Sequence, residues 1–169
     1  MKHWSEMPAE QWQENPFTLI GKEWMLVAAE KDGRVNAMTA AWGGLGFLWG
    51  KNVAFVFIRP QRFTKELVDG ADTLSLTFFG PEYRDMLGYM GRVSGREEDK
   101  VQKTGLTVLH EGETPYFDQA RLTIIGRKLY AQELKPECFV EPDCDSRWYP
   151  DRDYHTMYVV EVEKILKAE

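Results

Sequence analysis

Residues 24–39 read WMLVAAEKDGRVNAMT, and this stretch decides the fold. Two runs rich in apolar residues, Trp24 to Ala29 and Arg34 to Thr39, flank the turn Lys31-Asp32-Gly33. An Asp-Gly pair tolerates the positive φ angles that a tight hairpin requires. The stretch therefore predicts two antiparallel strands joined by a short turn.

Further strands are predicted where β-branched and aromatic residues are enriched. The runs are Val53 to Ile58, Thr73 to Phe79, Leu122 to Leu134 and Thr156 to Ile165. The last two are long, which is typical of curved barrel strands. A parallel doubly wound sheet needs an amphipathic helix between successive strands, and the early hairpin and late long strands leave no room for this. The pattern favours an all-β core, an antiparallel barrel with peripheral helices.

Three short helices are expected on the periphery. Thr64 is placed to cap a helix from Lys65 to Asp69. Pro81 is placed to open a second helix that runs to Met90. A third is expected over Glu97 to Lys103, ending at Gly105.

Length and composition indicate one domain over residues 1–169, with 43% apolar and 13% aromatic residues. A formal charge of −6 argues against a nucleic-acid partner. No stretch has the pattern of a signal peptide or the roughly 20 apolar residues of a membrane helix, so we expect a cytoplasmic protein without a membrane partner. Cys138 and Cys144 are then expected as free thiols, and their spacing with His155 does not predict a metal site.

The glycine-rich stretch 42–50, WGGLGFLWG, invites a nucleotide-binding interpretation. Its glycines are spaced one residue too far apart for GxGxxG, and a predicted strand follows where a dinucleotide site needs a helix. A phosphate-binding P-loop fails as well, because Lys51 is followed by Asn52 in place of Ser or Thr. Neither kind of site is predicted here.

Small residues follow the second strand of the hairpin, in NAMTAAW at 36–42. They let a flat ligand approach the backbone, whose free N–H groups can donate hydrogen bonds, and the Thr39 hydroxyl adds another donor. The alternative is that Ala40 and Ala41 simply pack beneath Trp42 at a barrel corner.

RPQRFT at 59–64 carries two guanidinium groups and a hydroxyl at a predicted helix start. Arg59, Arg62 and Thr64 together suit a phosphate, because charge-assisted hydrogen bonds to its oxygens are strong. A solvated arginine pair bound to nearby carboxylates is the alternative.

GRVSGREEDK at 91–100 is a second basic turn that leads into a predicted helix. Ser94 is a candidate N-cap, and Gly95 lets the backbone come close to a ligand. Two basic turns in one acidic domain favour a phosphate-bearing ligand. His155, at the start of the last strand, is a candidate to meet a cofactor ring or to donate a proton; a structural histidine is the alternative.

In this order, NAMTAAWG, RPQRFT, GRVSGREEDK and HTMYVVEV resemble the flavin reductase-like family of FMN-binding split barrels, over about Thr18 to Glu163. The resemblance implies a homodimeric antiparallel split β-barrel with FMN near the subunit interface. It implies that the isoalloxazine lies against the backbone of residues 38–42. Relatives commonly carry Ser at the position of Ala41, so a side-chain contact there is not expected.

The resemblance also implies the set of cofactor-binding residues. They are Met38, Thr39, Ala40, Ala41 and Trp42 at the ring, Arg59, Arg62, Thr64, Ser94, Gly95, Arg96 and Lys100 at the phosphate, and His155 and Tyr158 on the closing strand. His155 is the one candidate for a catalytic role.

The implied function is an NAD(P)H-dependent reductase that transfers hydride to N5 of FMN, with small molecules as electron donor and acceptor. An FMN-bound electron carrier of the flavoredoxin kind, reduced by a protein partner, is the alternative. A relative that binds haem or no cofactor is disfavoured by the arginine and lysine clusters.

Overall fold

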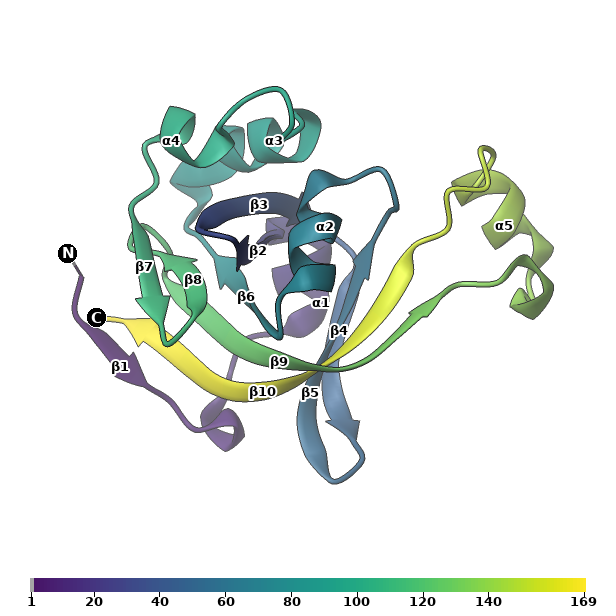
Figure 1. The fold of residues 1–169 in the computed structure, drawn as a ribbon. Helices are drawn as coiled ribbons and strands as arrows, with labels where there is room; N and C mark the ends of the chain where they lie inside the picture. The colour runs from purple at the N-terminus through teal and green to yellow at the C-terminus, as the bar shows by residue number, and fades with distance from the viewer. Residues whose placement is uncertain (1) are drawn as a thin grey trace.

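A computed structural model describes residues 2–169 and shows a strongly curved antiparallel sheet with helices around it (Figure 1). The main sheet runs β3-β2-β6-β9-β10-β5-β4, with β1 paired to β10, and β7 and β8 form a separate hairpin. The strands are β1 (Trp4–Glu6), β2 (Met25–Lys31), β3 (Arg34–Ala40), β4 (Gly43–Leu48), β5 (Lys51–Ile58), β6 (Thr73–Phe78), β7 (Val108–Glu111), β8 (Thr114–Phe117), β9 (Leu122–Glu133) and β10 (Thr156–Ala168). The α-helices are α1 (Pro16–Thr18), α2 (Phe63–Gly70), α3 (Arg84–Arg92), α4 (Lys100–Thr104) and α5 (Pro142–Trp148). The predicted all-β core with peripheral helices is confirmed.

The predicted first hairpin is also confirmed. β2 and β3 pair from Met25 opposite Ala40 to Lys31 opposite Arg34. The two residues of the turn, Asp32 and Gly33, have φ angles of 51° and 74°. Positive φ at both positions matches the twist of the two strands, which is why this pair of residues fixes the register. β3 is left as an edge strand.

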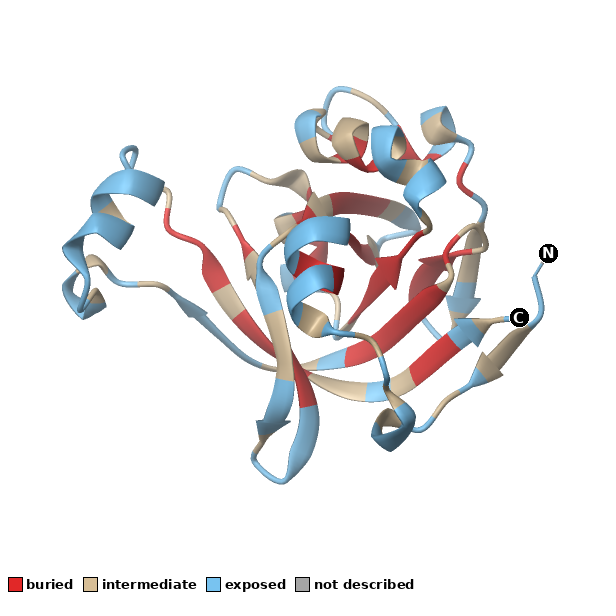
Figure 2. Cartoon of the chain, turned by 180° about the vertical axis from the view of Figure 1, so that it is seen from behind, coloured by how far each residue is buried: buried red, intermediate tan, exposed pale blue. Residues whose placement is uncertain are grey.

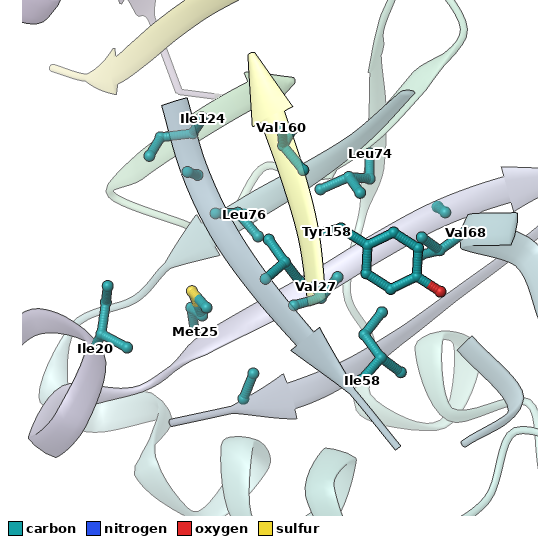
Figure 3. Packing of buried hydrophobic residues seen from close by; sticks show 14 of the residues in the cluster. Ile20, Met25, Val27, Ile58, Val68, Leu74, Leu76, Ile124, Tyr158 and Val160 are labelled. Atoms are coloured by element: carbon teal, nitrogen blue, oxygen red, sulfur yellow. The ribbon is translucent and has the colours of Figure 1, made fainter. Parts of the chain in front are cut away.

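β9 and β10 form the long curved centre of the sheet. They pair over most of their lengths, with register shifts between Val159 and Val160 and between Val162 and Lys164. Such irregularities increase the local twist, so the two strands bend around the core. On their concave side, apolar side chains such as Val27, Leu76 and Val160 pack with the ring of Tyr158 (Figure 3).

Helix positions differ from the sequence predictions in detail. α2 begins at Phe63 with Arg62 as its N-cap residue, so the prediction that Thr64 caps this helix is wrong. α4 begins at Lys100, and its cap is Asp99, whose side chain accepts a hydrogen bond from the Gln102 N–H. Ser94 therefore lies in a separate turn, and the prediction that it caps this helix is wrong.

Some strands were not predicted. The glycine-rich stretch is β4, which pairs with β5 to form a projecting hairpin (Figure 1). Its glycines, Gly43, Gly44 and Gly46, removed the apolar alternation by which strands are recognised in a sequence. β1 and the β7–β8 hairpin are too short to give a periodic signal.

A segment of 22 residues, 134–155, leaves the barrel between β9 and β10 and carries α5; we call it the excursion. It extends away from the sheet, and most of it is exposed (Figures 1 and 2). Cys138 and Cys144 both lie in it as exposed free thiols. None of the helices in residues 2–169 has the length and apolar character to span a bilayer.

We predict that Gly126→Ala lowers the free energy of unfolding by about 1–3 kcal/mol, because overpacking a full core is destabilising. A Cβ at Gly126 would overlap Val160 Cγ1 and lie 3.0 Å from Glu161 O, where β9 meets the bulged part of β10. Urea unfolding measures the loss. Gly44→Ala is the matched strand control, since its Cβ would meet only Phe55 Cδ2 at 3.8 Å. Equal losses in the two variants would contradict the prediction.

Candidate functional site

The open edge of β3 borders a hollow of about 210 Å³. We call it the first hollow. Its lining residues are Met38, Thr39, Ala40, Ala41, Trp42, Phe57, Arg59, Arg62 and His155. All five predicted ring-binding residues, two of the predicted arginines and the predicted histidine therefore meet at one place, although they come from three separate parts of the chain.

Backbone groups dominate the side of this hollow formed by β3. Because β3 pairs only with β2, alternate N–H and C=O groups along its other edge are left out of the sheet. The Thr39 hydroxyl is turned away from them and donates to Leu87 O of α3 at 2.5 Å. The expectation that this hydroxyl faces a ligand is therefore not supported, whereas the backbone of residues 38–42 is available.

A second hollow of about 210 Å³ shares Arg62 with the first. Its lining residues are Asn36, Gln61, Arg62, Phe63, Thr64, Arg92, Val93, Ser94, Gly95 and Lys100. The two predicted basic turns, far apart in the sequence, both contribute to its wall. Two adjoining hollows of this size have the scale of a small-molecule site.

Two cations line the second hollow, and one of them, Arg62, lines the first hollow as well. Lys100 is only 2% exposed, and its ammonium donates to Met90 O at 2.8 Å. Arg62 Nη1 donates to Gly91 O at 2.8 Å. Both therefore bind carbonyls in the last turn of α3, a position that favours positive charge. No ion pair with a carboxylate is recorded for either cation within residues 2–169.

These contacts leave the two charges incompletely satisfied. Arg62 Nη2 is buried and has no hydrogen-bond partner among the described residues. Burial lowers the pKa of Arg62, and burial together with the charge of Arg62 lowers the pKa of Lys100 to about 8. An unpaired buried cation is costly. The arrangement is that expected of a receptor for an anion.

Neutral hydrogen-bond donors also lie at the second hollow, which Arg62 and Lys100 line. Within the described part of the chain, residues 2–169, no side chain caps the N-terminus of α2, so its first N–H groups are free to bind an anion. Thr64, 1% exposed, accepts a hydrogen bond from Asn36 Nδ2 at 2.8 Å and keeps its own hydroxyl hydrogen to donate. A Cβ at Gly95 would overlap Asn36 Oδ1 and lie 2.7 Å from Phe63 Cδ1, so the turn can come this close only as glycine.

Two predicted phosphate ligands have carboxylate partners instead. Arg59 pairs with Asp153 at 3.0 Å and donates to Trp148 O at 3.0 Å. Arg96 pairs with Glu66 and lines neither hollow. The alternative interpretation of an arginine bound to nearby carboxylates fits both, although Arg59 still borders the first hollow.

His155 is held at the back of the first hollow. Its Nδ1 lies 2.7 Å from the Tyr149 hydroxyl, and its ring centre is 5.2 Å from that of Trp42. Burial and the nearby Arg59 charge lower the pKa of His155 to about 4. The imidazole is thus neutral at physiological pH, which suits a hydrogen-bonding group better than a proton donor.

Tyr158 does not join the site. Its side chain is fully buried in the barrel core (Figure 3), and its hydroxyl donates to Asp69 Oδ1 at 2.5 Å. Neither hollow includes it. Successive side chains of an extended segment point to opposite faces of the sheet. Tyr158 lies three positions after His155, so its side chain points into the core while that of His155 lines the first hollow.

Sequence reasoning missed several lining residues. Asn36 is 3% exposed, and a buried amide needs a partner, but its position on a strand gave no sign of that burial. Phe57 lies in a predicted strand, where an aromatic residue is as typical of the core as of a site. Trp148 and Tyr149 line neither hollow, but they lie on the excursion against the lining residues Trp42 and His155, and no motif in the sequence indicated these contacts.

No protein-family model matches this chain, and no curated protein matches it in sequence. Solved structures do match. Flavoredoxin from Methanosarcina acetivorans has 18% identity and a TM-score of 0.66 over 85% of this chain and 67% of that one. An FMN-binding domain of a flavin reductases-like enzyme from Shewanella baltica OS155 has 13% identity and a TM-score of 0.70 over 98% and 78%.

An FMN-binding protein from Thermus thermophilus has 21% identity and a TM-score of 0.66 over 94% of this chain and 79% of that one. These structures show that the chain has the FMN-binding split-barrel fold, as the sequence resemblance implied. A fold shared at this identity leaves the activity to be argued from the site.

We predict that Lys100→Met changes how stability depends on pH. The folded-state pKa of Lys100 lies near 8, below its ordinary value of 10.5, so between these values the unfolded chain binds a proton that the folded chain does not. The free energy of unfolding therefore gains a contribution that rises with pH in this window. The wild type should gain stability relative to Lys100→Met between pH 8 and 10. Urea unfolding at each pH measures the free energy of unfolding of both proteins. A difference between them that stays constant from pH 8 to 10 would contradict the burial of this charge.

Proposed function

We propose that this chain binds FMN, with the isoalloxazine in the first hollow and the phosphate in the second, and that it is an NAD(P)H-dependent flavin reductase. The observation that carries the FMN proposal is the buried, unpartnered Arg62 Nη2 beside Lys100. A phosphate supplies two negative charges and three strong acceptor oxygens at once. Hydrogen bonds to charged groups are each worth about 1.5–3 kcal/mol, so bonds from both cations to one phosphate would offset part of the cost of burying them.

The chain's own residues have distinct roles in this proposal. The free edge of β3 and the backbone at Ala41 and Trp42 bind and orient the ring, while Phe57 and Trp42 shield it from water. The bound flavin supplies the hydride-accepting atom, N5, and the protein supplies orientation and electrostatics. His155, neutral near pH 7, offers a hydrogen bond and does not serve as the acid.

An electron carrier of the flavoredoxin kind is the second candidate, and the charge of the excursion favours it. The excursion carries six acidic residues against three lysines and arginines. It borders the first hollow through the contact of Trp148 with Trp42, whose ring centres are 5.1 Å apart. This excess of negative charge opposes the pyrophosphate of a nicotinamide nucleotide and attracts a basic protein partner.

An anaerobic titration separates the two candidates. The protein is purified without added flavin, saturated with FMN and titrated with NADH and then NADPH while the absorbance of oxidised flavin is followed. Bleaching by a nicotinamide at a rate that supports turnover is the result expected of a reductase, and it identifies the donor. Bound flavin that only dithionite bleaches would contradict the reductase proposal and support the carrier. A chain that binds no FMN would overturn both.

We also propose a homodimer, in the cytoplasm. Large apolar side chains lie exposed near the tip of the β4–β5 hairpin, namely Phe47 (72%), Trp49 (57%) and the neighbouring Tyr130 (42%). Exposed aromatic clusters of this kind are typical of contact surfaces. Sedimentation equilibrium of the wild type and of Phe47→Ser/Trp49→Ser tests the assembly: the wild type should be dimeric and the variant monomeric.

We predict that Arg62→Gln weakens FMN binding about 10- to 150-fold, corresponding to one charge-assisted contact. Riboflavin, which lacks the phosphate, should lose much less affinity than FMN, because Arg62 only borders the first hollow. Flavin fluorescence quenching measures both affinities. Arg96→Gln is the matched control, because this arginine is exposed and paired with Glu66, and it should leave both affinities unchanged. Equal losses for FMN and riboflavin in Arg62→Gln would show that Arg62 does not bind the phosphate.

A further inference from the structure

The excursion returns to the barrel through a tyrosine that contacts the candidate-site histidine. Tyr149 is 7% exposed and His155 is 8% exposed. The hydroxyl of the first lies 2.7 Å from Nδ1 of the second. The guanidinium of Arg59 lies over the Tyr149 ring, 4.9 Å from its centre, and is itself fixed by Asp153. Tyr149 is therefore held in place from two sides.

The contact decides which nitrogen of the imidazole carries the proton. Burial raises the pKa of Tyr149, so its hydroxyl keeps its hydrogen at physiological pH. A buried hydroxyl hydrogen needs an acceptor, and Nδ1 is the partner that the structure provides. When Nδ1 accepts, the neutral ring must carry its proton on Nε2.

The other nitrogen is available to a ligand. No hydrogen bond is recorded for His155 Nε2 in residues 2–169, and it is not among the buried atoms that lack a partner. Since His155 lines the first hollow, Nε2 is the ring atom through which a bound molecule can be reached. The nearby Trp42 ring and the Phe57 ring, 6.4 Å from the imidazole centre to centre, limit how far the ring can turn.

We propose that Tyr149 is a positioning residue that keeps the proton of His155 on Nε2. His155 then donates a hydrogen bond into the first hollow, to a carbonyl or a ring nitrogen of a planar ligand bound there. Tyr149 does not touch the ligand. The identity of the ligand as a flavin rests on the proposed function, whereas the tautomer is a property of the chain alone. The proposal gives the excursion a role in the site that no motif in the sequence indicates.

The tautomer is tested without any ligand. Two-bond ¹H–¹⁵N spectra of the ¹⁵N-histidine-labelled protein distinguish a protonated Nε2 from a protonated Nδ1. The wild type is expected to show the Nε2–H form, and Tyr149→Phe is expected to show a mixture of both forms. A wild type with its proton on Nδ1, or a Tyr149→Phe spectrum identical to that of the wild type, would overturn the proposal.

Tyr154→Phe is the matched control. Tyr154 is 5% exposed and its ring centre lies 4.9 Å from that of Tyr149, but its hydroxyl donates to Asp145 Oδ1. Its loss removes a buried hydroxyl from the same excursion and should leave the His155 tautomer unchanged. A shift of the tautomer in this variant as well would mean that packing of the excursion, and not the Tyr149 hydroxyl, sets the proton.

Flavin titrations then test the donor role. Tyr149→Phe should weaken the binding of FMN and of riboflavin by the same factor, about 2- to 10-fold. The reason is that the His155 hydrogen bond is made to the flavin ring and not to the phosphate. Unchanged affinity for both flavins would remove His155 as a donor to the ring. If the wild type binds neither flavin, the proposed function fails while the spectra still decide the tautomer.

Discussion

Arg62 and Lys100 bind two successive carbonyls in the last turn of α3, and the site is organised around this contact. It joins the end of β5, through the turn that follows it, to the layer formed by α3 and α4. It also concentrates two positive charges where residues 2–169 offer backbone carbonyls and form no ion pair with either charge. The same interaction therefore fixes the helical layer against the barrel and makes the second hollow attractive to an anion.

The barrel adds an exposed backbone edge beside the Arg62 and Lys100 pair. The Asp32-Gly33 turn sets the register of β2 and β3 and leaves β3 as an edge. The open edge ends in small residues, which leave room for a flat ring against the backbone on one side of Arg62. The N-terminus of α2 lies on the other side of Arg62. The two hollows thus share one arginine, and in the proposed function the planar end of FMN occupies the first and its anionic end the second.

Much of this arrangement could be predicted from local sequence. The hairpin, the long strands and the two basic turns each have a signal that depends on neighbouring residues only, and their order along the chain indicated the fold. The sequence could not distinguish Arg62, which has an unpartnered nitrogen among the described residues, from Arg59, which is paired with Asp153. The carboxylate of Asp153 lies 94 positions after Arg59 in the chain. Tyr158 was misplaced for a related reason: its core position depends on the pairing of β10 with both neighbours.

The excursion shows the same limit most clearly. Its composition resembles that of an ordinary acidic loop, yet Arg59 and Gln61 both bind Asp153. Trp148 and Tyr149 pack against Trp42 and Arg59, which line the first hollow. These contacts make the excursion part of the site wall. Residues there can affect ring binding while the phosphate subsite is left intact, so the two halves of the site are separable by mutation.

The most direct test of the buried-charge receptor is proton uptake on binding, measured by titration calorimetry at pH 8.5 in buffers of different ionisation enthalpy. With a pKa near 8, Lys100 is largely deprotonated there, whereas the FMN phosphate, with a second pKa of about 6, is already a dianion. An anion beside Lys100 raises its pKa, so FMN should bind with uptake of a proton, and riboflavin should bind with none. FMN binding whose heat is the same in every buffer would contradict the account, because it would place the phosphate away from Lys100.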